Sequence, residues 1–167
     1  MNRVKLLSLN VRGLRDTCKR NRIFSYLSKF KSDIILLQES HVLETDYACW
    51  KSDWGKGEIY TNCYSSQSAG QIIMLTRNEN VVSHHIIIPG RCHILEMSRG
   101  DTSLAIVNIY APNKDLDQIN FYREINQYLQ NRTKTDFLIL EGDFNIVQCQ
   151  NKDKQFGTNV CKKLSRS

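Results

Sequence analysis

The chain has 167 residues, of which 41% are hydrophobic and 24% are charged, and its formal net charge at pH 7 is +6. This composition is typical of one globular domain that can bury a core. No run of about 18 apolar residues is present, and the N-terminus lacks the apolar stretch of a secretory signal, so we expect an intracellular protein with no membrane partner. The six cysteines form no C-x-x-C pair, which argues against a structural zinc site.

Charge is distributed unevenly along the chain. Residues 1–31 carry a net charge of +8, residues 32–147 carry −6, and residues 148–167 carry +4. A basic N-terminal region can lie along a phosphate backbone, although a solvated helix face has the same composition. We expect residues 1–147 to form the domain, and residues 148–167, which are polar and Lys-rich without periodicity, to form a mobile basic tail.

Hydrophobic patterns predict alternating strands and helices in the N-terminal half. The expected elements are a strand at 4–9, a helix at 18–30, a strand at 33–38, a short helix or loop at 43–53, and strands at 58–63 and 71–76. In the first helix, Ile23, Leu27 and Phe30 form an apolar stripe, and Thr17 is the expected N-cap. The succession strand, helix, strand indicates an α/β unit.

The C-terminal half continues with strands and one further helix. The expected elements are a strand at 81–88, a hairpin formed by strands at 93–97 and 103–109, a helix from 115 to about 130, and a strand at 137–140. The last strand is an unbroken apolar run from Phe137 to Leu140, which predicts that it is buried. Gly142 follows it and permits a sharp turn of the backbone.

Polar side chains stand where four of these strands end. They are Asn10, Glu39, Tyr110, and the pair Asp143 and Asn145. Each has an ordinary structural explanation, as a turn residue, a surface acid or the edge of the core. Because ligands bind at the carboxyl ends of strands in open α/β sheets, we expect the set to converge on one rim if the strands share a sandwich.

The residue types of this set indicate a reaction at a phosphate ester. Glu39 is a hard oxygen ligand suited to magnesium, and Asn10 can add or orient an oxygen without adding charge. Asp143 can hold and deprotonate a water, and Asn145 can fix that carboxylate or a phosphate oxygen. Tyr110 can donate a hydrogen bond to a phosphate or a leaving oxygen. Together they predict metal-assisted cleavage of a phosphate ester.

Four segments in chain order resemble those of the exonuclease–endonuclease–phosphatase superfamily, most closely the apurinic-endonuclease-like domain of LINE-type retrotransposons. The segments are Ser8–Leu14, Asp33–His41, Val107–Asn113 and Gly142–Asn145. The resemblance implies an α/β (α+β) fold, namely a deoxyribonuclease-I-like four-layer sandwich with two mainly antiparallel sheets between helices. It further implies a monomeric nuclear domain that nicks DNA with Mg²⁺, or with Mn²⁺ as the alternative ion.

The resemblance also implies roles for individual residues. Asn10 and Glu39 would be associated with the metal, Tyr110 would meet the scissile phosphate, and Asp143, supported by Asn145, would activate or orient the attacking water. The residues expected to contact DNA are Arg12, Arg15, Lys19, Arg20, Arg22 and Asn113.

The sequence departs from the family pattern after Asp143. Domains of this family continue into further strands and end with an acidic metal residue and a Ser-Asp-His motif, whereas all four histidines of this chain precede Asp143. A donor to the reacting phosphate contributes about 10²–10³ in rate and a general base about 10²–10⁴. We therefore expect a C-terminally truncated domain, lacking its last strands, that is weakly active or inactive and leaves an open, apolar sheet edge.

Three alternatives remain open at this point, one of which is a chain without any function. Another is a phosphoesterase of the same superfamily that acts on phosphoinositides or another non-DNA substrate. The third is a non-catalytic remnant that binds DNA through its basic residues, with salt-sensitive affinity and no product.

Overall fold

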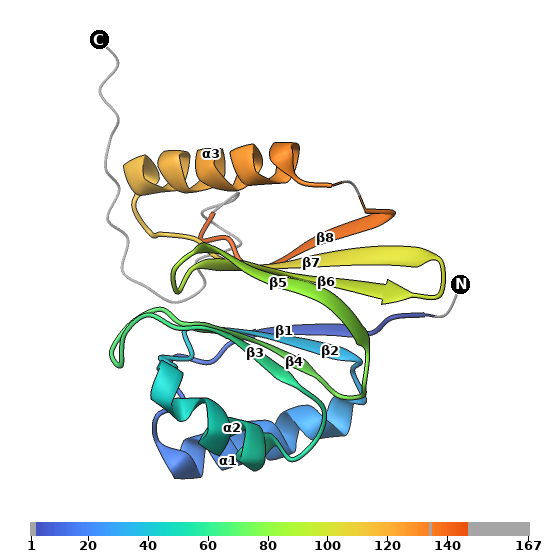
Figure 1. Ribbon diagram of the computed structural model, residues 1–167. Coiled ribbons are helices and arrows are strands. Elements are labelled where there is room, and N and C mark those ends of the chain that lie inside the picture. Colours follow the sequence, from blue (N-terminus) through green and yellow to red (C-terminus); the bar gives the residue numbers. More distant parts are fainter. Residues whose placement is uncertain (1–2, 134, 147–167) are drawn as a thin grey trace, which may run out of the picture.

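Two four-stranded sheets pack face to face in the computed structural model, which describes residues 3–133 and 135–146 (Figure 1). The first sheet has the order β1-β2-β4-β3 and consists of β1 (Leu6–Asn10), β2 (Ile34–Gln38), β3 (Ile59–Asn62) and β4 (Gln71–Leu75). The second has the order β5-β6-β7-β8 and consists of β5 (Asn80–Ile88), β6 (Cys92–Arg99), β7 (Thr102–Tyr110) and β8 (Phe137–Asp143).

Helices cover the outer face of each sheet, which makes four layers (Figure 1). The first sheet is covered by α1 (Thr17–Leu27) and α2 (Tyr47–Trp54), and the second by α3 (Asp115–Asn131). Short 3₁₀ turns η1 (Ser28–Phe30) and η2 (Glu44–Asp46) follow α1 and precede α2. The expected four-layer α/β sandwich is therefore confirmed.

Both sheets are mixed, and their parallel pairs determine where the predicted site residues lie. β1 runs parallel to β2, with Asn10 opposite Gln38, and β7 runs parallel to β8, with Tyr110 opposite Asp143. The other strand pairs are antiparallel. Parallel strands end at the same edge of a sheet, so each sheet brings two strand ends to one rim.

Strand β2 shows why the core forms as it does. Ile34 and Leu36 point between the two sheets, whereas Ile35 and Leu37 point towards α1 and α2, and all four are fully buried. Successive side chains of a strand face opposite sides, so a strand covered on both faces is apolar throughout. The unbroken apolar run predicted this burial correctly.

The prediction of a buried strand at 137–140 is wrong. Phe137, Leu138 and Leu140 are 41%, 43% and 40% exposed, although the strand itself forms as β8. Among the described residues β8 pairs only with β7, so it is an edge strand with apolar side chains on the surface. An apolar run predicts a strand, but it does not show which neighbours cover that strand.

Two predictions about α1 are also wrong in detail. The N-cap is Asp16 rather than Thr17, and its carboxylate accepts a hydrogen bond from Lys19 N at 2.6 Å. The buried residues of the helix are Arg20, Phe24 and Leu27, whereas Phe30 is exposed.

None of the described helices has both the length and the apolar character needed to cross a membrane. The predicted basic tail at 148–167 lies outside the described residues, so its boundary with the domain stays a prediction.

Candidate active site

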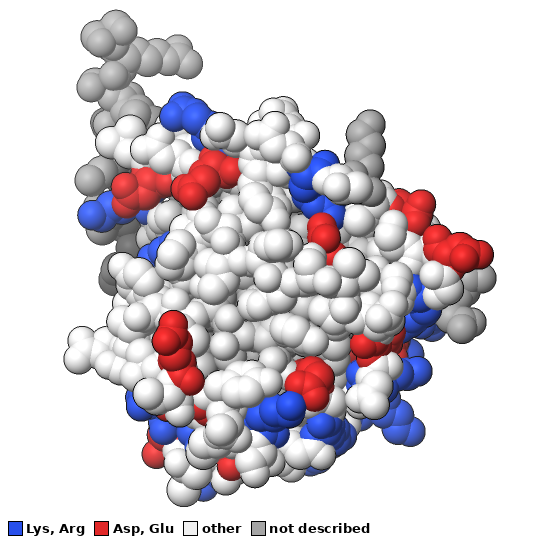
Figure 2. Space-filling view, viewed as in Figure 1, with Lys and Arg blue, Asp and Glu red and all other residues white. Residues whose placement is uncertain are grey.

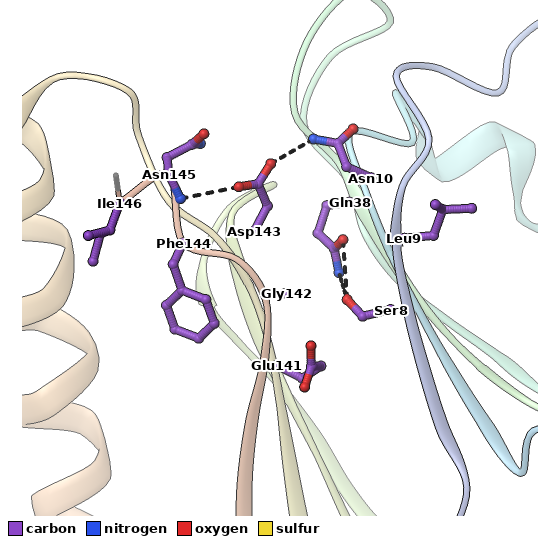
Figure 3. A pocket seen from close by; sticks show the side chains of 10 residues that line it. All are labelled: Ser8, Leu9, Asn10, Gln38, Glu141, Gly142, Asp143, Phe144, Asn145 and Ile146. Carbon is purple, nitrogen blue, oxygen red and sulfur yellow. Dashed lines mark hydrogen bonds between the residues drawn. The ribbon is translucent and has the colours of Figure 1, made fainter. Parts of the chain in front are cut away.

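One amide joins the two sheets at the rim. Asn10 Nδ2 at the end of β1 donates hydrogen bonds to Glu39 Oε1 at 2.9 Å and to Asp143 Oδ2 at 2.8 Å. Glu39 follows β2 directly, and Asp143 is the last residue of β8. Figure 3 shows the Asp143 carboxylate facing the Asn10 amide. The two carboxylates therefore lie on the same side of the molecule, one from each sheet, as the strand ends predicted.

A backbone hydrogen bond to the oxygen of the Asn10 amide fixes the orientation of this amide. Asn10 Oδ1 accepts a hydrogen bond from Arg12 N at 3.2 Å, which leaves the NH₂ group to face the carboxylates. Arg12, Glu39 and Asn145 all have φ near +50°, a left-handed conformation that costs a residue with a side chain about 1 kcal/mol or more. Such strain collects at functional sites, and here Arg12 and Glu39 bond to the Asn10 amide, while Asn145 bonds to Asp143.

Asp143 is held in place by the turn that follows β8. Asn145 N donates to Asp143 Oδ1 at 3.1 Å, while Asn145 Nδ2 donates to Ala111 O at 2.6 Å. Gln118 of α3 donates to Asn145 O at 3.0 Å. Both oxygens of Asp143 therefore accept hydrogen bonds, so the carboxylate has a defined direction (Figure 3).

Tyr110 ends β7 beside the same carboxylates and is almost buried. Burial, followed by a hydrogen bond with Glu39 and the negative charge of Glu39, raises the pKa of Tyr110 to about 12. The phenol therefore keeps its proton at neutral pH and can act as a hydrogen-bond donor.

Arg91 is a neighbour of the site that the sequence did not reveal. Its guanidinium lies 4.9 Å from the centroid of the Tyr110 ring, and its Nη1 donates to Tyr110 O at 3.4 Å. It follows the Pro89-Gly90 turn, which predicts the end of a strand but not the position of the next side chain.

The titration of Tyr110 gives a testable prediction. Because its pKa in the folded state exceeds the unfolded value of about 10, the stabilisation from Tyr110 is complete below pH 10 and is lost as the pH rises to about 12. The difference between the ultraviolet titration curves of the wild type and of Tyr110→Phe should show one phenol with a midpoint near pH 12. Replacement of the exposed Tyr64 by phenylalanine should leave this step unchanged, and a Tyr110 step near pH 10 would contradict the assignment.

A cleft of about 520 Å³ opens between the strand ends (Figure 3). Its lining consists of Ser8, Leu9, Asn10, Gln38, Glu141, Gly142, Asp143, Phe144, Asn145 and Ile146. The lining includes two carboxylates, those of Glu141 and Asp143, and several amides, but neither lysine nor arginine. A phosphate entering this part of the structure would meet negative charge, so the cleft suits a phosphate ester only together with a cation.

The rim offers hard oxygen donors for such a cation. The described residues contain no group of three or more His, Cys, Asp or Glu side chains that could hold a metal ion. They do bring together the carboxylate oxygens of Glu39 and Asp143, which the NH₂ group of Asn10 orients. This donor set fits Mg²⁺, which keeps several waters and takes few protein ligands, or Mn²⁺.

The prediction that Arg20 contacts DNA is wrong. The side chain is buried, with Nε donating to Asp53 Oδ2 at 2.7 Å and Nη1 donating to Leu14 O at 3.0 Å. The guanidinium also lies 5.1 Å from the Trp50 ring of α2. It holds α1 against α2 and has no face free for a phosphate.

The other predicted DNA-binding residues are at or near the surface. Arg12, Arg22 and Asn113 are exposed, Arg15 pairs with Asp46 at 2.5 Å, and Lys19 Nζ donates to Arg12 O at 2.7 Å. In Figure 2, Lys and Arg side chains alternate with Asp and Glu over the lower layer, where α1 and α2 lie. The contact of these five residues with DNA stays a prediction.

Replacement of Arg20 by methionine tests its structural role. The change leaves the Asp53 carboxylate without its partner inside the α1–α2 contact, so we expect the free energy of unfolding to fall by about 3 kcal/mol. Urea denaturation measures the change. Arg22→Met, two residues along the same helix but exposed, should cost no more than about 0.5 kcal/mol. Equal costs for both variants would contradict this role for Arg20.

Comparison with known proteins was informative for the fold. No protein-family model matches the chain. It is 26% identical over 146 residues to the transposon TX1 uncharacterized 149 kDa protein of Xenopus laevis, which covers 86% of this chain and 11% of that protein. It is 28% identical over 158 residues to an exodeoxyribonuclease of Bacillus subtilis, which covers 86% of this chain and 59% of that protein.

A solved structure shows the same architecture. The chain superposes on an AP endonuclease from Archaeoglobus fulgidus with a TM-score of 0.70 at 17% identity, over 86% of this chain and 58% of the archaeal chain. The chain has the exonuclease–endonuclease–phosphatase fold. The expectation from the four sequence segments is thereby confirmed for the fold. The chain spans about three-fifths of the length of the Bacillus and archaeal proteins and about a tenth of the Xenopus protein.

Proposed function

We propose that this chain is a divalent-metal-dependent phosphodiesterase domain that nicks DNA and belongs to a transposable element. The observation that carries the proposal is the Asn10 amide, which holds one carboxylate from each sheet beside a protonated phenol. The names of the similar proteins support it, since they include a transposon protein, an exodeoxyribonuclease and an AP endonuclease.

The proposed roles follow from the contacts. Glu39 would bind Mg²⁺ or Mn²⁺, and Asn10 would orient its carboxylate through the NH₂ group. The bound ion would supply positive charge to the phosphate oxygens. Tyr110 would donate its phenol proton in a hydrogen bond to the phosphate. Asp143 would orient the attacking water and accept its proton, and Asn145 N keeps Asp143 Oδ1 in position.

DNA would cross the rim between the two sheets. Arg12 follows the end of β1 beside the cleft, and Asn113 follows Tyr110 at the end of β7. Both would contact the DNA strand near the scissile phosphate. Arg15, Lys19 and Arg22 would contact phosphates farther away, which makes affinity depend on salt. The proposed location of such a domain is the nucleus.

We propose that this chain binds metal and DNA but cleaves DNA slowly. None of the four histidines lines the cleft, and the sequence contains no Ser-Asp-His motif. Without an imidazole donor to the phosphate, the rate would be lower by about 10²–10³.

A plasmid-nicking assay combined with DNA-binding measurements tests the proposal. The wild type should bind DNA with salt-sensitive affinity and nick a supercoiled plasmid slowly with Mg²⁺ or Mn²⁺, whereas a chelator or Asp143→Ala should abolish nicking. Nicking that survives Asp143→Ala would contradict the proposal. Binding without product in either metal would indicate a non-catalytic DNA-binding domain, and faster hydrolysis of a soluble phosphoester would indicate a non-DNA substrate.

A further inference from the structure

A chain of hydrogen-bonded polar side chains crosses the apolar interior between the two sheets. Gln38 Nε2 donates to Asn108 Oδ1 at 2.7 Å, Asn108 Nδ2 lies 3.2 Å from His93 Nε2, and His93 Nδ1 lies 3.0 Å from His84 Nε2. Gln38, Asn108 and His93 are buried. At the other end, Gln38 Nε2 also donates to Ser8 Oγ at 3.1 Å in the wall of the cleft.

The donors and acceptors of this chain run in one direction. The two hydrogens of Asn108 Nδ2 are shared among three acceptors, Leu37 O at 3.2 Å, Ile72 O at 3.3 Å and His93 Nε2, which fixes the NH₂ end of the amide. His93 Nε2 must then accept, so the proton of His93 is on Nδ1 and is donated to His84 Nε2. Burial lowers the pKa of His84 and places the pKa of His93 well below its usual value, so both rings are neutral at pH 7.

The Gln38–Asn108 bond lies directly behind the rim. Gln38 pairs with Asn10 across β1 and β2 and precedes Glu39 in the chain. Asn108 is two residues before Tyr110 on β7. The bond therefore joins the first sheet to the second close to Glu39 and Tyr110, which lie at the rim.

Stability alone does not account for these residues. Two amides and an imidazole in an apolar interior cost desolvation that their hydrogen bonds only offset, and apolar side chains of the same shape are often equally stable there. A fully satisfied buried network does specify one relative position of the elements that it joins.

We propose that Gln38, Asn108 and His93 are positioning residues, which hold the two sheets at the separation that lets Glu39 and Asp143 share the Asn10 amide. The effect of these residues on metal binding rests on the proposed function, whereas their effect on the separation of the sheets does not. The positions of the residues at the rim can be measured without turnover.

The test removes both partners of the inter-sheet bond with side chains of similar shape. In the full chain, the double variant Gln38→Met/Asn108→Leu should still fold, because both partners of the inter-sheet bond are removed together. Its thermal midpoint should be lower than that of the wild type, because His93 Nε2 and Ser8 Oγ lose the amides that bond to them. Its Mn²⁺ dissociation constant, measured by electron paramagnetic resonance, should rise about tenfold, the lower end of what the loss of supporting residues costs a metal site. The NMR signals of the Asn10 side-chain amide should shift. A double variant that removes an exposed pair at the far end of the second sheet, Asn80→Ala/Ser98→Ala, should change neither quantity.

Three results decide the inference. An unchanged Asn10 signal and Mn²⁺ affinity in the folded double variant would overturn it. If that variant does not fold, His93→Leu, which leaves Asn108 bonded to Gln38, should shift the same Asn10 signal by a smaller amount, and no shift would overturn it. Nitrogen NMR of the wild type should find His93 protonated on Nδ1, and the other tautomer would overturn the direction of the chain. A wild type that binds no Mn²⁺ would refute the proposed function, while the Asn10 signal would still decide this inference.

Discussion

Replacement of Gly142 by alanine is expected to lower the free energy of unfolding by about 3 kcal/mol and to displace the end of β8. A Cβ atom at this position would lie 2.0 Å from Ile109 O and 2.8 Å from Ile109 C and N. These are backbone atoms of the adjacent strand β7, which cannot move aside as the tip of a side chain can. The φ of +143° adds strain for any residue with a side chain.

A matched control separates the steric clash from the strain of the backbone. Gly100 in the β6–β7 turn has φ of +61°, and a Cβ there would meet nothing within 4 Å. Gly100→Ala should therefore cost only the left-handed strain, about 1 kcal/mol. Urea denaturation of both variants measures the difference, and equal costs would show that β8 does not pass β7 as closely as described.

The second large effect is expected from Asp143→Asn. The substitution keeps the size of the side chain and an oxygen for Asn10, but it removes one of the two carboxylates that share that amide. We expect the Mn²⁺ dissociation constant to rise by roughly 10–100-fold, with little change in the thermal midpoint. Titration of free Mn²⁺ by electron paramagnetic resonance provides the measurement.

The control for this change removes an equal charge elsewhere. Asp101 is exposed in the β6–β7 turn, so Asp101→Asn alters the net charge in the same way without touching the rim. Its Mn²⁺ affinity should equal that of the wild type. A similar loss in both variants would show that Mn²⁺ responds to the net charge of the protein and not to the rim.

Periodicity and strand-end chemistry predicted most of the fold and the rim. The apolar runs that became β2, β4 and β7 were visible because strands covered on both faces are apolar throughout. The polar residues at the strand ends converge because the strands are parallel in pairs, with Asn10 opposite Gln38 and Tyr110 opposite Asp143. The sequence supports such predictions because residue type and position along one strand carry the information.

The errors concern which parts of the chain meet in space. Arg20 has the charge expected of a phosphate contact, but Asp53, 33 residues later, lies beside it and keeps it inside. Leu138 has the apolar side chain of a core residue, but it lies on an edge strand and is exposed. Arg91 reaches Tyr110 only through the packing of a turn against β7. None of these neighbours can be identified from local pattern.

Polar residues within or at the end of apolar strands indicate buried hydrogen bonds. His93 and Asn108 each interrupt a run of apolar residues, and Gln38 ends one; a buried polar side chain needs a partner. The sequence shows that three such residues exist. It does not show that Gln38 meets Asn108, because these two residues come from different sheets, whereas His93 and Asn108 are opposite one another in β6 and β7.

Paramagnetic NMR with Mn²⁺ tests the central claim most directly, since it locates the ion without requiring turnover. We expect substoichiometric Mn²⁺ to broaden the side-chain amide signals of Asn10 and Asn145, while the signal of Asn80, at the opposite end of the second sheet, stays sharp. Asp143→Asn should weaken the broadening. Equal broadening of Asn10 and Asn80, or none at Asn10 when Mn²⁺ is in excess, would contradict a cation site at the rim.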